Sequence, residues 1–138
     1  MTGEDKIDAL IARFFSAFDN RSGARPELAA LAACFTHKAT IARRFDAGVE
    51  LFTIEEFAVP RIMLLTQGAL RDFHEWEISS TTNIYNGIAA RTSRYAKAGL
   101  LDGADYSGSG TKCFQLIDTD FGWRIASLAW VDDSVGER

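Results

Sequence analysis

Three side chains of the sequence combine into a candidate proton-transfer site: His74, Tyr95 and Asp132. His74 lies in a segment with the composition of a central strand, and an imidazole with a pKa of about 6.5 suits general-base chemistry at neutral pH. Tyr95 and Asp132 could orient, donate or accept a proton beside it. The alternative is that His74, the only histidine on such a strand, is structural or faces solvent.

Arg91 is the main candidate for binding an anionic group, because a guanidinium presents a planar fork of donors to paired oxygens. An arginine that points into a core is seldom left without a partner. We therefore expect Arg91 either to pair with Asp132 or Glu75 or to await an anionic ligand, and the internal pair is the safer expectation. Arg43 raises the same alternatives, or lies at a solvated rim.

Metal and cofactor motifs are missing from the sequence. His37 and His74 are far apart, neither cysteine has a partner at ligand spacing, and the glycines near residue 105 do not precede a helix. We expect no metal and no cofactor.

Cys34 and Cys113 are interpreted as buried, reduced thiols of a cytoplasmic protein. His37 is interpreted as a cap at the end of a helix.

Length and charge exclude several classes of protein. The chain has 138 residues, so one domain over 1–138 is expected. Its net charge of −4 argues against a nucleic-acid partner, and no apolar run approaches the ~20 residues needed to cross a bilayer.

The elements that must position these residues begin with three helices. Apolar residues recur with a helical period from Ile7 to Phe18, with Phe14 mid-stripe in the core. Pro26 opens a second, shorter helix that extends to Phe35. Thr53–Glu56 has the pattern of a capping box and starts a third helix. Pro60 lies inside that helix, where a bend or a split is expected.

Strands are expected after the helices. Asn86-Gly87 is a strong hairpin signal, because both turn residues must adopt positive φ. Gly99–Gly110 is expected to be a long glycine-rich loop, and a second hairpin is expected about residues 119–122. The expected strands cover residues 39–45, 73–85, 88–97, 111–118 and 123–131, with 49–52 as a candidate for a further strand, which gives an α+β domain with helices on one face of the sheet.

Period-two alternation assigns the strand residues to two faces. The inward set is expected to be Arg91, Ser93, Tyr95, Phe114, Leu116, Leu128 and Trp130. The outward set is expected to be Cys113, Gln115, Trp123 and Ile125. An outward Trp123 and Ile125 would suit a homodimer interface, whereas an error of one residue would reverse these assignments.

The order of elements resembles the nuclear transport factor 2-like superfamily. The resemblance rests on Ala39-Thr40-Ile41 after the second helix, the Asn86-Gly87 hairpin, and Phe114–Ile117 leading to Gly122–Ile125. It implies a cone in which a curved, mostly antiparallel mixed sheet wraps over three helices. It is closest to the SnoaL-like polyketide cyclases and ketosteroid isomerases, many of which form homodimers through the outer sheet face.

The ketosteroid isomerase pattern is altered at each catalytic position. Where that group has a tyrosine in its first helix, this chain has Phe14. The aspartate base that follows the Ala-Thr-hydrophobic triplet is replaced by Arg43, and the acidic donor before the strand phenylalanine by Lys112. Because the reaction needs a carboxylate base beside acidic donors, the pattern argues against steroid isomerase activity.

The leading functional hypothesis is a protein that binds a small apolar or aromatic ligand in the cone. One alternative is a cofactor-free lyase, isomerase or cyclase that uses His74 with Asp132 or Tyr95. Another is a dimeric interaction module whose cone is filled. The expected ligand-binding residues are Arg43, Arg91, Ser93, Phe114, Leu116, Leu128 and Trp130.

Overall fold

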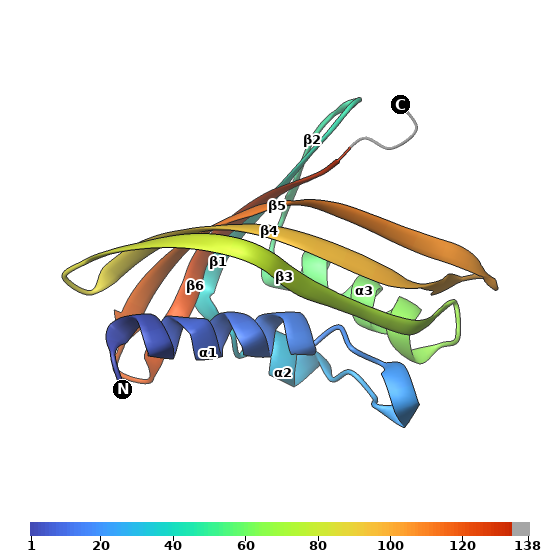
Figure 1. Ribbon diagram of the computed structural model, residues 1–138, viewed down its shortest axis with the longest axis horizontal. Coiled ribbons are helices and arrows are strands. Elements are labelled where there is room, and N and C mark those ends of the chain that lie inside the picture. Colours follow the sequence, from blue (N-terminus) through green and yellow to red (C-terminus); the bar gives the residue numbers. More distant parts are fainter. Residues whose placement is uncertain (134–138) are drawn as a thin grey trace.

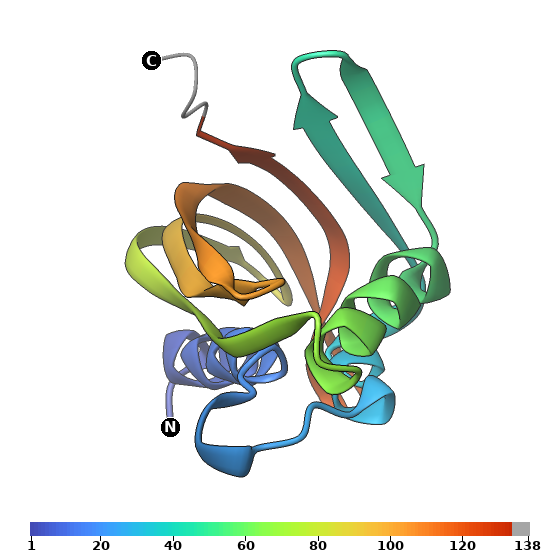
Figure 2. The same ribbon diagram turned by 90° about the vertical axis from the view of Figure 1, so that its right-hand side faces the viewer.

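The computed structural model describes residues 1–133 and has one six-stranded sheet curved over the helices (Figures 1 and 2). This agrees with the α+β cone expected from the sequence. The elements in chain order are α1 (Gly3–Ser16), η1 (Arg21–Gly23), α2 (Leu28–Ala32), β1 (Phe35–Phe45), β2 (Gly48–Phe52), α3 (Ile54–Thr66), β3 (Leu70–Tyr85), β4 (Ile88–Leu101), β5 (Ala104–Thr119) and β6 (Gly122–Asp132).

The sheet has the strand order β2-β1-β6-β5-β4-β3. Strands β1 and β6 run parallel, and the other neighbouring pairs are antiparallel. Figure 2 shows the sheet curling over α1 and α3, while the β1–β2 hairpin projects beyond the body of the cone. The interior therefore lies between the concave face of the sheet and the helices.

Helices α1 and α3 each begin after a capping threonine, and α3 begins where the sequence indicates. Thr2 and Thr53 each cap a helix and form a capping box, with Asp5 and Glu56 respectively. The expected apolar stripe of α1 is buried, and Phe14 at its centre has no exposed surface. Pro60 lies within α3, which runs as a single helix across it.

The second helix is shorter than expected, because α2 ends at Ala32 and the chain enters β1 at Phe35. His37 therefore lies within a strand and is not a helix cap. Cys34 is buried and Cys113 is exposed, and both are free thiols, so the expectation of two buried cysteines is wrong for Cys113.

The segment 99–110 is part of two long strands and not a loop. Strand β4 continues to Leu101 and β5 starts at Ala104, joined by a turn at Asp102 and Gly103. These two residues have φ values of 51° and 85°, close to the 47° and 90° of Asn86 and Gly87. Both turns are thus two-residue hairpins that require positive φ.

An irregularity in β6 reverses one expected pair of side chains. Gln115 pairs with Ser127, but the next residue, Leu116, pairs with Ile125. The extra residue on β6 shifts the alternation, as a β-bulge does. Trp123 and Ile125 are consequently buried, so their expected outward orientation is wrong.

The rest of the interior follows the expected alternation. Phe114, Leu116, Leu128 and Trp130 are buried, as are Arg91, Ser93 and Tyr95. Phe14 contacts the rings of Phe15, Phe18, Phe35 and Phe114 edge to face. Among residues 1–133, no helix is long and apolar enough to span a membrane.

Candidate functional site

A cavity of about 250 Å³ lies between α3 and the concave face of the sheet. Six of its 16 lining residues carry aromatic rings: one lies just after α1, and α3, β3, β4, β5 and β6 contribute one each. These rings belong to Phe18, Phe57, Phe73, Tyr95, Tyr106 and Trp130. Because a dry cavity of ~150 Å³ can hold benzene, this volume suits a molecule with one ring.

Charged side chains also line the cavity, and cations outnumber carboxylates. Four basic and two acidic residues contribute to the lining: Arg43, Arg61, Lys97, Lys112, Glu75 and Asp132. The chain as a whole carries a net charge of −4. The cavity is therefore a local region of positive charge within an acidic protein.

Asp132 is the centre of one polar cluster in this cavity. It accepts a hydrogen bond from the Tyr95 hydroxyl and lies 3.5 Å from Lys97 Nζ and 3.4 Å from Arg43 Nη2. Burial opposes ionisation of Asp132, but the Tyr95 hydroxyl and the nearby cations outweigh burial and lower its pKa. Burial, reinforced by Asp132, raises the pKa of Tyr95. The pair is thus a carboxylate held by a neutral phenol.

Lys112 and Glu75 form a second cluster, deeper in the cavity. Only 5% of the Lys112 side chain and 12% of the Glu75 side chain are exposed, and Nζ lies 3.6 Å from Oε1. The ammonium group lies over the rings of Tyr95 and Trp130, at 4.1 and 5.1 Å from their centroids. Burial lowers the pKa of Lys112, and Glu75 and Asp132 only partly oppose this.

Arg61 is positioned by aromatic rings of the cavity wall and by a carbonyl of its own helix. Arg61 Nη1 donates to the Phe57 carbonyl at 2.9 Å. Its guanidinium lies 4.4 Å from the Phe57 ring centroid and 5.2 Å from that of Trp130. Burial lowers the pKa of Arg61.

The cavity brings together four of the residues expected from the sequence. Tyr95, Asp132, Trp130 and Arg43 line it. Arg43 lies at the rim, where its side chain is 35% exposed and also faces Glu50.

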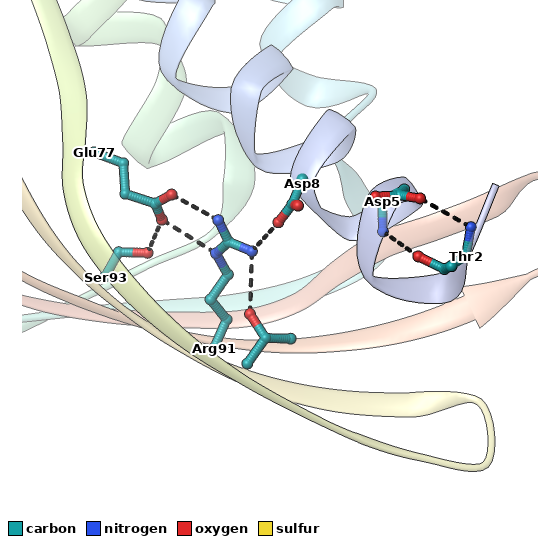
Figure 3. A network of polar contacts seen from close by, with 7 residues as sticks. Thr2, Asp5, Asp8, Glu77, Arg91 and Ser93 are labelled. Carbon is teal, nitrogen blue, oxygen red and sulfur yellow. Dashed lines mark hydrogen bonds and ion pairs between the residues drawn. The ribbon is translucent and has the colours of Figure 1, made fainter.

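Arg91 does not line this cavity, and the expectation that it shares a pocket with Tyr95 and Trp130 is wrong. Its Nη2 lies 2.6 Å from Glu77, and its Nη1 lies 2.6 Å from Asp8 on α1 (Figure 3). The internal pair anticipated from the sequence thus exists, but with other carboxylates than Asp132 and Glu75. Burial opposes the charge of Arg91, but these hydrogen bonds outweigh burial and raise its pKa.

His74 lies on the other face of the sheet from the cavity. Phe73 and Glu75 line the cavity, so alternation directs the residue between them outward. Its ring stacks on Trp76 with centroids 4.4 Å apart, and Trp76 is 40% exposed. The expected sharing of one cavity by His74, Tyr95 and Asp132 is therefore wrong.

The remaining expected ligand-binding residues belong to the core away from the cavity. Phe114, Leu116 and Leu128 are buried without lining it, and Ser93 donates a hydrogen bond to Glu77 in the Arg91 cluster. They pack in the interior of the cone outside the cavity.

Lys112, Lys97, Glu75 and Arg61 were not among the expected site residues. Lys112 is two residues from Phe114 and Glu75 is two residues from Phe73, so strand alternation places both charged side chains on the inward face. A charged side chain of inward parity in the middle of an apolar strand is uncommon unless it is paired. Among residues 1–133, no cluster of His, Cys, Asp and Glu is arranged to hold a metal ion.

Solved structures share this arrangement over nearly the whole chain. A nuclear transport factor 2-like superfamily protein from Salmonella enterica serovar Typhimurium aligns with a TM-score of 0.76 and 12% identity, covering 96% of this chain and 92% of its own. The chain has the nuclear transport factor 2-like fold.

Other proteins with this fold align equally broadly. A protein of unknown function with a cystatin-like fold from Nostoc punctiforme gives a TM-score of 0.70 at 15% identity, covering 94% of this chain and 90% of its own. A nuclear transport factor 2-like protein from Novosphingobium aromaticivorans gives 0.71 at 15% identity, covering 97% and 84%. No protein-family model matches the sequence, and no curated protein matches it. The nuclear transport factor 2-like fold is thus established by structure, at identities that show the fold alone.

Proposed function

We propose that this protein binds a small aromatic molecule carrying a carboxylate or similar anionic group in the cavity beneath α3. The observation that carries the proposal is the combination of an aromatic wall with four cations and two carboxylates in about 250 Å³. The aromatic rings supply contact area for a flat, apolar body. The surplus of positive charge favours an anionic end group.

Arg61 is the residue best placed to receive the anion. It is held by the Phe57 carbonyl and by the rings of Phe57 and Trp130, and no carboxylate among residues 1–133 forms an ion pair with it. Asp132, by contrast, already faces Arg43 and Lys97. A ligand carboxylate would therefore supply Arg61 with the partner it lacks, in a site where the contact is shielded from water.

A thermal-shift and calorimetric comparison tests the proposal. We expect 4-methylbenzoate to stabilise the protein and its neutral counterpart 4-methylbenzamide to do so much less. Arg61→Met should weaken 4-methylbenzoate binding by about tenfold or more, because a hydrogen bond to a charged group contributes about 1.5–3 kcal/mol. Arg25→Met is the matched control, since Arg25 is an exposed loop residue outside this cavity. Equal affinity for the acid and the amide would contradict the proposal.

The hydrogen bond between Tyr95 and Asp132 favours a second candidate, a cofactor-free isomerase, lyase or cyclase. A buried phenol can donate to a substrate carbonyl oxygen while a neighbouring carboxylate takes up a proton. This reading drops His74 and keeps the other two expected catalytic residues. It requires turnover of a carbonyl compound that is lost in Tyr95→Phe while 4-methylbenzoate still binds. Unchanged turnover in that variant would exclude it.

We also propose that two copies pair through the outer face of the sheet. A row of small side chains crosses five strands on that face, and their pairing is continuous: Ala42, Ala129, Cys113, Thr92 and Thr81. Small side chains permit the close approach of a second sheet. Two neighbours in fold, from Xanthomonas campestris and Exiguobacterium sibiricum, are described as kinase association domains, a description compatible with self-association of such a domain.

A further inference from the structure

We propose that Lys112 is a reactive amine that condenses with the carbonyl group of an aromatic aldehyde or ketone held in the cavity, forming an imine. This inference rests on the proposed function for delivery of the ligand, and it adds a covalent step to it. The three supporting observations are the burial of the amine, the nature of its contacts and the position of its carboxylate.

The first observation is that the amine lies at the cavity wall while almost none of it is exposed. Lys112 lines the cavity, yet only 5% of its side chain is exposed. Lysines are among the residues least often found fully buried. Apolar surroundings favour the neutral amine over the ammonium, and the neutral amine is the nucleophile.

The second observation is that three aromatic rings lie near the amine. Nζ lies 4.1 Å from the centroid of Tyr95, 5.1 Å from Trp130 and 5.9 Å from Phe14. Arg61 lies over the same Trp130 ring, at 5.2 Å. A one-ring molecule placed against Trp130 is therefore within reach of both an anion-binding guanidinium and a nucleophilic amine.

The third observation is a carboxylate that can take the proton of the amine. Glu75 Oε1 is 3.6 Å from Lys112 Nζ, beyond hydrogen-bond distance, and this buried oxygen has no hydrogen-bond partner among the described residues. A Lys–Glu pair on the surface would be hydrated, whereas both side chains of this pair are largely buried. Glu75 is thus placed to accept the proton that the ammonium must release before it attacks.

The reaction balances without an oxidant or a reductant. The lone pair of Nζ forms a bond to the carbonyl carbon, the C=O π bond breaks, and one proton of the nitrogen passes to the oxygen to give a hydroxyl. The C–OH bond then breaks and the second proton of the nitrogen leaves with the hydroxyl as water, so that one amine and one carbonyl give one imine and one water. The other charged groups that face the amine are Asp132 on β6, Lys97 on β4 and Arg61 on α3, and none of them is consumed.

Reductive trapping with 4-formylbenzoate and cyanoborohydride at pH 7 tests the inference. Hydride adds to the imine carbon and leaves one carboxybenzyl group on the nitrogen, and peptide mapping locates it among the four lysines of the chain. We expect labelling of Lys112 to exceed that of Lys6 and Lys38 at least about tenfold, because burial favours its neutral amine and the cavity holds the aldehyde beside it. Labelling of Lys112 should also level off at a lower pH than labelling of free lysine, because its pKa is lowered by burial.

Two controls separate this inference from the proposed function. An excess of 4-methylbenzoate, which has no carbonyl carbon to attack, should suppress labelling of Lys112 but not of Lys38. Lys112→Arg keeps the charge and should remove that label, while the labels on Lys6 and Lys38 stay unchanged. The competition needs no variant, so it remains informative even if Lys112→Arg does not fold.

The outcomes are distinguishable. Binding of 4-methylbenzoate with labelling spread evenly over the lysines, or centred on Lys97, would overturn the imine and leave the proposed function standing. Selective labelling of Lys112 that 4-methylbenzoate does not reduce, without any thermal shift, would leave a reactive lysine and overturn the proposed function. If 4-methylbenzoate does not bind and no lysine is labelled selectively, both the imine and the proposed function are overturned.

Discussion

At the scale of single residues, burial alone does not distinguish the side chains that hold the fold from those that can bind a ligand. Arg91 and Lys112 are about equally buried. Arg91, however, has its donors occupied by two carboxylates and Thr82, whereas Lys112 faces rings and one carboxylate beyond hydrogen-bond distance. The first arrangement is structural, and the second leaves capacity for a ligand.

Replacing Arg91 should therefore affect stability and not ligand binding. Arg91→Met removes the partner of Glu77, whose side chain is only 22% exposed. Removing one member of a buried ion pair typically costs about 3–5 kcal/mol, and we expect a loss near the lower value because Asp8 is half exposed. Chemical denaturation measures this loss in the free energy of unfolding. Arg94→Met is the control, because Arg94 forms an exposed ion pair with Asp133, and this variant should lose much less stability. Weakened 4-methylbenzoate binding in folded Arg91→Met would contradict this assignment.

Phe14 provides a second test at this scale. It has no exposed surface and contacts four other phenylalanines, so Phe14→Ala should reduce the free energy of unfolding by about 3–5 kcal/mol. Phe121 is 84% exposed in a turn, and Phe121→Ala should change it by less than about 0.5 kcal/mol. Similar losses in the two variants would show that the α1 face is wrongly placed.

At the scale of elements, glycines in the long strands set how closely the walls of the cavity approach. A Cβ built on Gly110 would meet the Val131 carbonyl and would lie 2.9 Å from the Tyr95 hydroxyl. On Gly108, two residues earlier, a Cβ would meet only the end of the flexible Lys97 side chain, at 3.2 Å. Glycine at 110 therefore serves close packing, as in other strand interiors where two backbones approach.

The two glycines allow a matched comparison. Gly110→Ala should lower the free energy of unfolding by about 1–3 kcal/mol, as overpacking does, and should displace Tyr95 from Asp132. Gly108→Ala should have a smaller effect on both. Unfolding measurements together with the Tyr95 ring signals in NMR spectra report the two consequences, and an unchanged Tyr95 environment in Gly110→Ala would count against the account of β5.

The sequence was a good guide to elements whose signals are local. The Thr53–Glu56 capping box, the α1 stripe and the Asn86-Gly87 hairpin all follow from neighbouring residues. Asp102-Gly103 carries the same kind of turn signal, but the surrounding glycines made residues 99–110 resemble a loop. Glycine is needed at 99 and 110 because β3 approaches Gly99 closely and β6 approaches Gly110 closely. These are tertiary contacts that the local sequence does not encode.

The candidate site was harder to predict for a related reason. Alternation indicates which face of the sheet a side chain occupies, and it correctly placed Arg91 and Tyr95 inside. It does not indicate how far along the cone each residue lies, because that depends on the stagger between strands. Arg91 pairs with Thr82 toward one end of β3, and Tyr95 with Glu77 nearer its middle. The bulge in β6 likewise reversed the expected orientation of Trp123, because one extra residue puts the two sides of the bulge out of phase.

At the scale of the whole molecule, the distribution of charge and the outer sheet face are the features with functional consequences. An acidic protein with a cationic cavity repels anions at long range and attracts them at short range. Binding of an anionic ligand should therefore depend more on its fit within the cavity than on long-range electrostatic attraction to the protein. The outer face offers a continuous row of small side chains, which the proposed second copy would cover.

We expect a homodimer of about 30 kDa in sedimentation experiments, twice the chain mass of 15.2 kDa. Ala129→Arg places a long, charged side chain in the middle of the small-residue row and should give monomers. Asp120→Arg makes the larger change in charge in an exposed turn and should leave the dimer intact. A monomeric wild-type protein at micromolar concentration would exclude the proposed interface.

The position of a bound aromatic acid tests the central claim most directly. Crystals grown with 4-iodobenzoate would locate the iodine by its anomalous scattering, independently of how the rest of the ligand is interpreted. The account predicts one site against Trp130 and Tyr95, with the carboxylate toward Arg61. A wider hollow lined by Thr40, Leu51, Gln115 and other residues of β1, β2, β5 and β6 is the alternative location. Iodine bound there, with the cavity beneath α3 closed to the ligand, would contradict the account.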